Sequence, residues 1–151
     1  MVNVNNFPIN PHDIEETTTL VEDAIYAVTG PFTLTPVDIS GKGKLKSIQI
    51  SIKNLEDKHK FKLKIEIDGS TVLYRTVGNL FYMYSASGAA PLGVPAKPIM
   101  FYEFDETNHY FSFCFNEELA FNSSLKVTLE CTEDTGCVVS YIITVHKKVV
   151  S

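Results

Sequence analysis

Apolar and polar residues alternate most regularly between positions 61 and 74 of the chain. Every second residue from Phe61 to Ile67 is apolar and the residues between them are charged, which is the pattern of a strand with one buried face. The dipeptide Asp68-Gly69 follows, and it favours a two-residue type I′ turn because both residues tolerate positive φ angles. The predicted hairpin pairs Ile67 with Ser70, Ile65 with Val72, and Leu63 with Tyr74.

Similar alternation recurs along the chain and predicts about eight or nine short strands, with no convincing amphipathic helix between them. Strands at this spacing bury their apolar faces in a two-sheet sandwich or a barrel, and an antiparallel β-sandwich of the jelly-roll type fits best. The expected strands are two around Gly30-Pro31, three consecutive antiparallel strands in 41–77, one near Leu80 to Tyr84, one in 99–105, one in 110–115 with Phe111, Phe113 and Phe115 on one face, and a closing pair in 124–131 and 137–145.

Residues 1–19 are predicted to form an extended arm in front of a single β-sandwich domain at residues 20–151. The arm is rich in Asn and carries Pro8 and Pro11, after which acidic residues could instead open a short helix. Phe7, Ile9 and Ile14 are its candidate anchoring residues, and the first two are candidate interface residues. Such an arm either lies on its own domain or reaches a neighbouring subunit, and both possibilities stay open.

A segment rich in Gly, Pro and small residues, 85–98, interrupts the strands and is expected to form a long loop. Long loops in small domains are often functional, although a tolerated insertion is an equal alternative. The candidate contact residues in and around this loop are Tyr84, Leu92, Val94 and Tyr102.

The charge is unevenly distributed in this acidic protein of 151 residues, whose net charge is −5 and whose pI is about 5.3. The overall charge argues against a general nucleic-acid binder. Eight of the 13 Lys and Arg residues nevertheless fall between positions 42 and 64, which indicates either a solvated sheet face or a basic face that meets an acidic face of another copy. The candidate interface residues are Lys60, Lys62, Lys64 and Arg75, with Lys62 expected opposite Arg75 on the outer face of the hairpin.

No catalytic motif is present in the sequence, so we expect no enzymatic activity and no cofactor. The four histidines lie in separate regions without the spacing of metal ligands. Cys131 and Cys137 flank a short turn where a disulfide is conceivable, but reduced, buried thiols are expected because the N-terminus lacks the features of a secretory signal. No apolar run has the length of a membrane span, and we expect synthesis in a host cytoplasm.

Several of these segments resemble small β-sandwich proteins of tailed bacteriophage virions. The likeness extends over roughly Gly41 to Val145, and its motifs are SGKGKLKSIQISIKN, LKIEIDGSTV, FNSSLKVTLECT and VVSYIITV. The resemblance implies a structural role in the virion, as a capsid decoration or auxiliary protein, a head-fibre component or a tail adaptor. It also implies that the chain self-associates and docks on other virion proteins, and it brings no catalytic residues.

A glycan-binding or receptor-binding β-sandwich module is the alternative from another class. Its site would be the 85–98 loop with the neighbouring tyrosines. The absence of Trp counts against this alternative, because indole rings are common sugar-stacking platforms.

Overall fold

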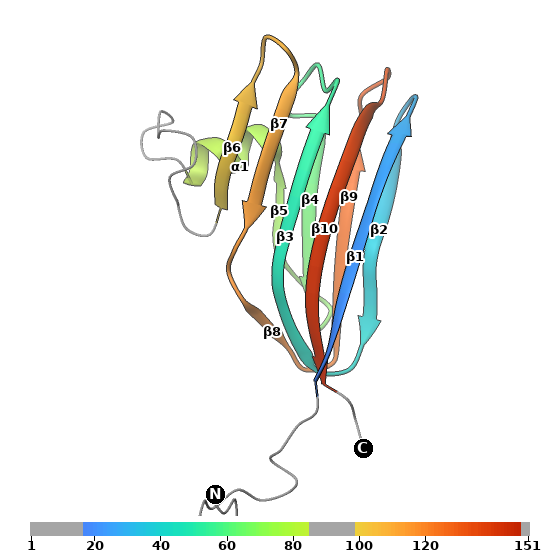
Figure 1. Cartoon of the computed structure of the whole chain (residues 1–151), viewed down its shortest axis with the longest axis vertical. Helices are drawn as coiled ribbons and strands as arrows, with labels where there is room; N and C mark the ends of the chain where they lie inside the picture. The colour runs from blue at the N-terminus through green and yellow to red at the C-terminus, as the bar shows by residue number, and fades with distance from the viewer. Residues whose placement is uncertain (1–16, 85–98, 149–151) are drawn as a thin grey trace, which may run out of the picture.

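Two antiparallel sheets face each other in the computed structural model, which describes residues 17–84 and 99–148 (Figure 1). The first, sheet A, has the strand order β1-β10-β3-β7-β6, and the short strand β8 pairs with the end of β3. Its strands are β1 (Thr17–Val28), β3 (Gly43–Lys53), β6 (Ile99–Asp105), β7 (Tyr110–Phe115), β8 (Leu119–Phe121) and β10 (Cys137–Lys148).

Sheet B lies against sheet A and has the strand order β2-β9-β4-β5. Its strands are β2 (Phe32–Ser40), β4 (Phe61–Ile67), β5 (Ser70–Thr76) and β9 (Ser124–Cys131). The two sheets confirm the predicted antiparallel β-sandwich.

The strand order is that of one long antiparallel ribbon folded over on itself. β1 pairs with β10, β2 with β9, β3 with β7 and β8, and β4 with β5, so each pair is nested inside the previous one. The Asp68-Gly69 turn is the innermost point of this nesting. Because successive pairs fall alternately in sheets A and B, the ribbon wraps into a jelly roll, as predicted.

The inner faces of both sheets form one hydrophobic core. Phe111, Phe113 and Phe115 project from β7 into it, as the alternation predicts, and each is at most 3% exposed. Burying side chains of this size contributes roughly 1.5–3 kcal/mol each. The alternating residues of β9 and β10 are buried as well, so the apolar pattern identifies the core correctly: Leu125, Val127, Leu129, Cys131, Val139, Tyr141, Ile143 and Val145.

The hairpin of β4 and β5 has the predicted turn but not the predicted register. Both turn residues have positive φ, 53° at Asp68 and 82° at Gly69, which confirms the type I′ turn. Ile67 faces Ser70 as expected, but the register then shifts and Ile65 pairs with Leu73. The extra residue is Val72, which is 51% exposed. This bulge moves every later β5 residue by one position, because side chains alternate with period two.

The bulge changes which β5 residues reach the core. Leu73 and Thr76 are buried, whereas Tyr74 is 38% exposed, so the predicted inward position of Tyr74 is wrong. Arg75 pairs with Leu63 rather than with Lys62, and the predicted Lys62–Arg75 opposition is wrong for the same reason.

Residues 41–77 form three consecutive strands, as predicted, but β3 does not pair with the other two. β3 belongs to sheet A, whereas β4 and β5 belong to sheet B. The closing strands are likewise divided, with β9 in sheet B and β10 in sheet A. Alternation predicts a buried face but not the neighbouring strand, and in this fold β3 and β4, like β9 and β10, are consecutive in the chain but lie in opposite sheets.

The strand predicted near Leu80 to Tyr84 is instead helix α1 (Val77–Tyr84). The side chain of Thr76 caps it, since its Oγ1 accepts a hydrogen bond from the backbone N–H of Asn79 at 3.1 Å. Val77, Leu80 and Phe81 then follow at helical spacing, and the first two are fully buried. Aromatic residues favoured the strand prediction, but the cap and this spacing decide the local structure.

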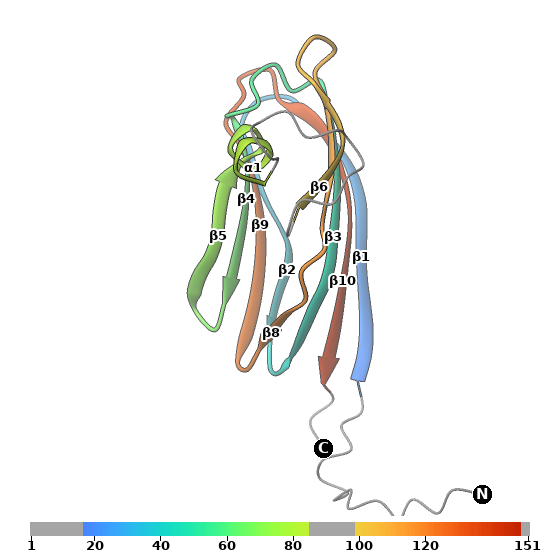
Figure 2. The same cartoon turned by 90° about the vertical axis from the view of Figure 1, so that its left-hand side faces the viewer.

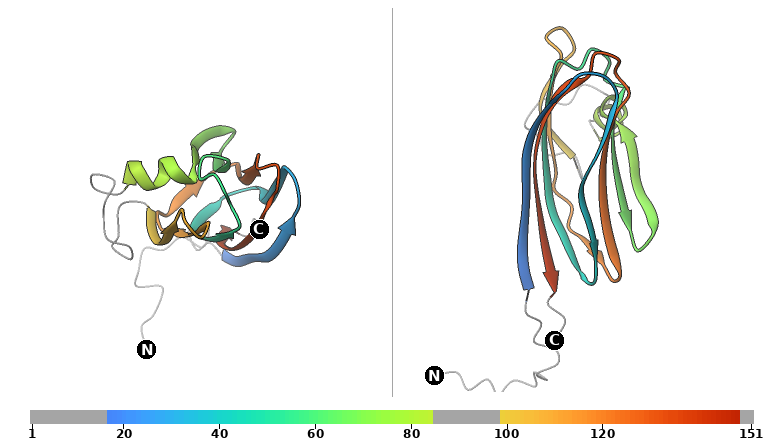
Figure 3. Two further views of the ribbon diagram at one scale, coloured as in Figure 1. Left: turned by 90° about the horizontal axis from the view of Figure 1, so that it is seen from above. Right: turned by 90° about the vertical axis from the view of Figure 1, so that its right-hand side faces the viewer.

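Helix α1 closes one side of the sandwich, between β5 of sheet B and β6 of sheet A (Figure 2). Phe81 stacks on Phe104 of β6 with ring centroids 3.9 Å apart and meets Phe101 edge-on at 5.3 Å. The opposite side is bordered by β1 and β2, which Figure 3 shows facing the viewer. No described segment covers that side.

The predicted arm and the predicted loop fall largely outside the described part of the chain. β1 begins at Thr17, inside the range assigned to the arm, and residues 1–16 are not described. Phe7, Ile9, Leu92 and Val94 also lie outside the described residues.

Candidate functional site

The lysines of β4 lie on the outer face of sheet B, where acidic and aromatic side chains surround them. Lys62 and Lys64 flank the ring of Tyr74, with their Nζ atoms 5.2 and 5.1 Å from its centroid. The Tyr74 hydroxyl donates a hydrogen bond of 2.5 Å to Oε2 of Glu130, which raises the pKa of Tyr74. Lys62 stands opposite Glu130 in the sheet. The positive charge of this face is therefore balanced within the subunit.

Lys60 neutralises a buried carboxylate at the end of the same strand. Its Nζ lies 3.6 Å from Oε1 of Glu133, whose side chain is only 6% exposed. The backbone N–H of Asp57 donates to the other carboxylate oxygen of Glu133 at 3.1 Å. Glu133 sits in the connection from β9 to β10, so this ion pair supports the link between the two sheets.

Other basic residues of the cluster also have partners within the chain. Lys46 pairs with Glu118, Lys64 lies 3.4 Å from Glu66, and Lys58 lies 2.6 Å from Glu106. The hydrogen bond with Glu106 raises the pKa of Lys58. Arg75 donates to the backbone oxygen of Tyr74. The structure thus brings Lys60, Lys62 and Lys64 together as predicted, but with acids interleaved among them.

The outer face of sheet A has a different character, because small polar and aliphatic side chains dominate it. Ser140, Ser51 and Ser112 stand side by side on β10, β3 and β7, and the hydroxyls of Ser51 and Ser112 are 3.1 Å apart. A shallow groove of about 390 Å³ lies over this row, with Ile25 and Ile142 among its walls. Ile25 is 78% exposed and Ile142 is 46% exposed. The sequence reasoning did not identify this face, although period-2 alternation in β10 placed Ile142 outside the buried set.

A second groove, of about 410 Å³, lies at the end of the sandwich where β1, β7 and β10 meet their loops. Asn54 and His109 line it, and both adopt positive φ, at 62° and 63°. Nδ1 of His109 is buried and has no hydrogen-bond partner among the described residues. Gly136 closes the groove floor with φ of 73°, and a Cβ there would lie 1.8 Å from the backbone oxygen of Val28. Its lining also includes Glu56, Thr135 and Cys137.

Cys131 and Cys137 are free, buried thiols, as expected, with Sγ atoms 3.7 Å apart. The hydrogen bond that Cys137 donates lowers the pKa of Cys131, and the same bond raises the pKa of Cys137. The third cysteine, Cys114, is also buried and free.

The predicted loop contacts are only partly described. Tyr102 lies on β6 and is 46% exposed, and a hydrogen bond with Cys114 raises its pKa. Tyr84 is the last residue of α1. Among residues 17–84 and 99–148, no group of three or more His, Cys, Asp and Glu side chains could hold a metal ion. None of the helices in that part of the chain is long and apolar enough to cross a membrane.

No protein-family model matches the sequence, and no curated protein matches it. Among solved structures, the chain is similar to the crystal structure of the infectious bursal disease virus VP2 subviral particle, with 10% sequence identity and a TM-score of 0.24. The alignment covers 91% of this chain and 42% of that chain, so this chain spans less than half the length of that protein.

Proposed function

We propose that this chain is a non-enzymatic structural subunit of a virus particle that acts through protein–protein assembly. The finer proposal is a tailed bacteriophage, with the chain as a capsid decoration or auxiliary protein, a head-fibre component or a tail adaptor. It would be made in the host cytoplasm and reside in the virion, in contact with other virion proteins and with further copies of itself.

The observation that carries this proposal is the exposed, weakly charged surface of sheet A beside the β1 edge. Val21, Ile25 and Ile142 are 56%, 78% and 46% exposed there, and exposed aliphatic residues grouped on one face are typical of protein contacts. The jelly-roll architecture supports the same role, since viral capsid domains use it repeatedly. Fold alone does not assign function, so the surface is the stronger argument.

Mass spectrometry of density-purified phage particles tests the proposal directly. Particles from the virus that encodes this chain should contain its peptides at a stoichiometry comparable to that of other structural proteins. These peptides should remain with the particles after a high-salt wash, because salt screens interactions between charges and has little effect on an apolar contact. Peptides found only in the soluble lysate would contradict the proposal.

A glycan-binding module is the second candidate, because lectin domains also use the jelly roll and Tyr82 and Tyr102 are 50% and 46% exposed. Saturable binding on a glycan array that is lost in the Tyr102→Ala variant would favour this candidate. Tyr110→Ala is the matched control, since Tyr110 is 40% exposed on the neighbouring strand β7.

A further inference from the structure

The four edge strands of the two sheets differ in how they are protected from pairing with another chain. An exposed edge carries free backbone N–H and C=O groups, and proteins commonly block it with bulges, prolines or charged residues. The register shifts between Leu34 and Val37 at edge strand β2, which also contains Pro36. It shifts at the β5 edge as well, and between Phe101 and Glu103 at the β6 edge. Three of the four described edges are therefore interrupted.

The fourth edge, β1, has no bulge and no proline, and its charged residues are the acidic pair Glu22 and Asp23. Its register against β10 runs without a shift from Thr17 opposite Lys148 to Val28 opposite Cys137. The strand TTTLVEDAIYAV contains no Pro, Gly, Lys or Arg. Exposed apolar side chains line it, since Val21, Ile25 and Tyr26 are 56%, 78% and 42% exposed. An edge of this length without a bulge or a proline can pair with a strand of another chain.

We propose that β1 is a pairing edge, at which a second copy of this chain adds its own β1 in antiparallel orientation about a two-fold axis. The two copies of sheet A would then form one continuous sheet. A second copy is the occupant we infer because it offers an edge of identical length and twist, so one contact covers both open edges at once. The inference deepens the proposed function and rests on it only for the biological role of the dimer.

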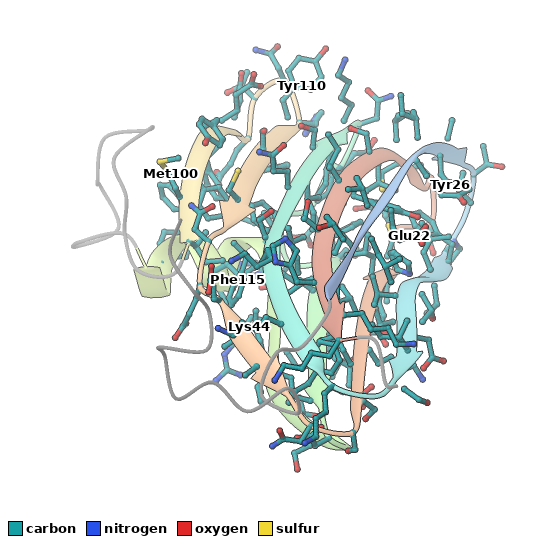
Figure 4. All side chains as sticks on the ribbon, turned by 60° about the horizontal axis from the view of Figure 1, so that its bottom comes forward. Glu22, Tyr26, Lys44, Met100, Tyr110 and Phe115 are labelled. Carbon is teal, nitrogen blue, oxygen red and sulfur yellow. The ribbon has the colours of Figure 1, made fainter. Side chains whose placement is uncertain are left out.

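The side chains of β1 select a register for this pairing. A two-fold axis at Glu22 would place like charges directly opposite each other, which is destabilising. An axis at Ala24 instead places Glu22 opposite Tyr26 of the second copy, twice by symmetry. Figure 4 shows Glu22 and Tyr26 together along the β1 edge. The same chemistry already occurs in sheet B, where the Tyr74 hydroxyl donates to the Glu130 carboxylate at 2.5 Å.

Sedimentation velocity of the full chain over a range of concentrations measures the pairing. We expect a reversible dimer whose dissociation constant rises about tenfold or more in Ile25→Glu, because an axis at Ala24 places residue 25 opposite Asp23 of the second copy and like charges directly opposite each other are destabilising. Val72→Glu is the matched control, since Val72 is also an exposed aliphatic residue but lies in the bulge of edge strand β5. Far-UV circular dichroism and thermal unfolding establish that both variants are folded.

A crosslink separates edge pairing from any other dimer. With the axis at Ala24, the two copies of Ile25→Cys lie diagonally across the axis, at about 7–8 Å, and a short bismaleimide should join them. Val72→Cys should give no crosslinked dimer, and the three native cysteines are buried. A wild-type monomer at every concentration, or an Ile25→Glu dimer as tight as wild type, would overturn the inference. A dimer in solution whose peptides are absent from particles would instead contradict only the virion function.

Discussion

The two outer faces of the sandwich are built from the same kind of strand and yet differ in what they leave available. The face of sheet B carries lysines, glutamates and a tyrosine that satisfy one another: Lys62, Lys64, Glu66, Tyr74 and Glu130. The face of sheet A carries serines and exposed aliphatic residues, with Ile25 78% exposed. Charge is conspicuous in the sequence, but the exposed aliphatic residues lie on the other face, that of sheet A.

This difference teaches that a cluster of like charges in sequence does not predict a like-charged surface. Strand β9 comes to lie beside β4 from a distant part of the chain and supplies Glu130 opposite Lys62. The lysines before residue 54 belong to β3 or to the turn in front of it, and β3 lies in the other sheet. The basic interface expected from the sequence therefore stays a prediction that competes with internal neutralisation.

The largest expected change in stability comes from Lys60, and a lysine of the other sheet, Lys53, is its control. Lys60→Met should lower the free energy of unfolding by about 1–2 kcal/mol, because it leaves the buried Glu133 carboxylate without its cation. The figure is below that of a fully buried pair, since Lys60 is itself 40% exposed. Lys53→Met on sheet A should change it by less than about 0.5 kcal/mol. Urea unfolding measures both, and equal losses would break the comparison.

A smaller effect is expected from two turn aspartates, and it depends on pH. Hydrogen bonds from the backbone of Ser123 and Ser124 lower the pKa of Asp68, and those from Asn108 lower the pKa of Asp105. A carboxyl group whose pKa is lower in the folded state stabilises the protein at every pH above its unfolded-state pKa, which is about 3.8 for Asp. This stabilisation is lost as the pH falls through the folded-state pKa.

Asp68→Asn should therefore lower the melting temperature at neutral pH, and its difference from wild type should shrink below about pH 4. Asp105→Asn should have the weaker effect, since Asp105 binds only its own turn, whereas Asp68 ties the β4–β5 turn to the β8–β9 turn. Asparagine keeps the tolerance of Asp68 for positive φ. Thermal unfolding from pH 2 to 7 is the measurement, and a difference that grows in acid would contradict the assignment.

The smallest expected effect distinguishes two tyrosines of similar exposure. Tyr74→Phe removes the hydrogen bond to Glu130 and should lower the melting temperature slightly. Tyr110→Phe on sheet A, where Tyr110 is 40% exposed, should leave it unchanged. Ultraviolet titration should also show that Tyr74→Phe loses a tyrosine that ionises above the ordinary pKa of 10.

The sequence predicted the buried faces well because alternation is a local property of each strand. Phe111, Phe113, Leu129 and Ile143 are all in the core where the pattern places them. The type I′ turn at Asp68 was predictable for the same reason, since it depends on two adjacent residues. Strand partners were not predictable, because a jelly roll pairs segments that lie far apart along the chain.

The errors have specific physical causes. No residue around Val72 predicts a bulge. The one inserted residue reversed the inward and outward positions of Leu73 and Tyr74. Thr76 is recognisable as a helix cap only from the helical spacing of the apolar residues that follow it. The aromatic residues in 80–84 favoured a strand instead, so this spacing was not recognised. The β1 edge could not be identified from sequence, since edge position is a property of the assembled sheet.

The nested ribbon has a consequence for how the chain reaches its structure during synthesis. The innermost hairpin around Asp68-Gly69 joins near neighbours, whereas β1 pairs with β10, which is synthesised after all the other described strands. Contacts between distant segments form slowly because loop closure must precede them. Among the described strands, β1 is thus made first and paired last, and until β10 has been made both edges of β1 are open to other chains.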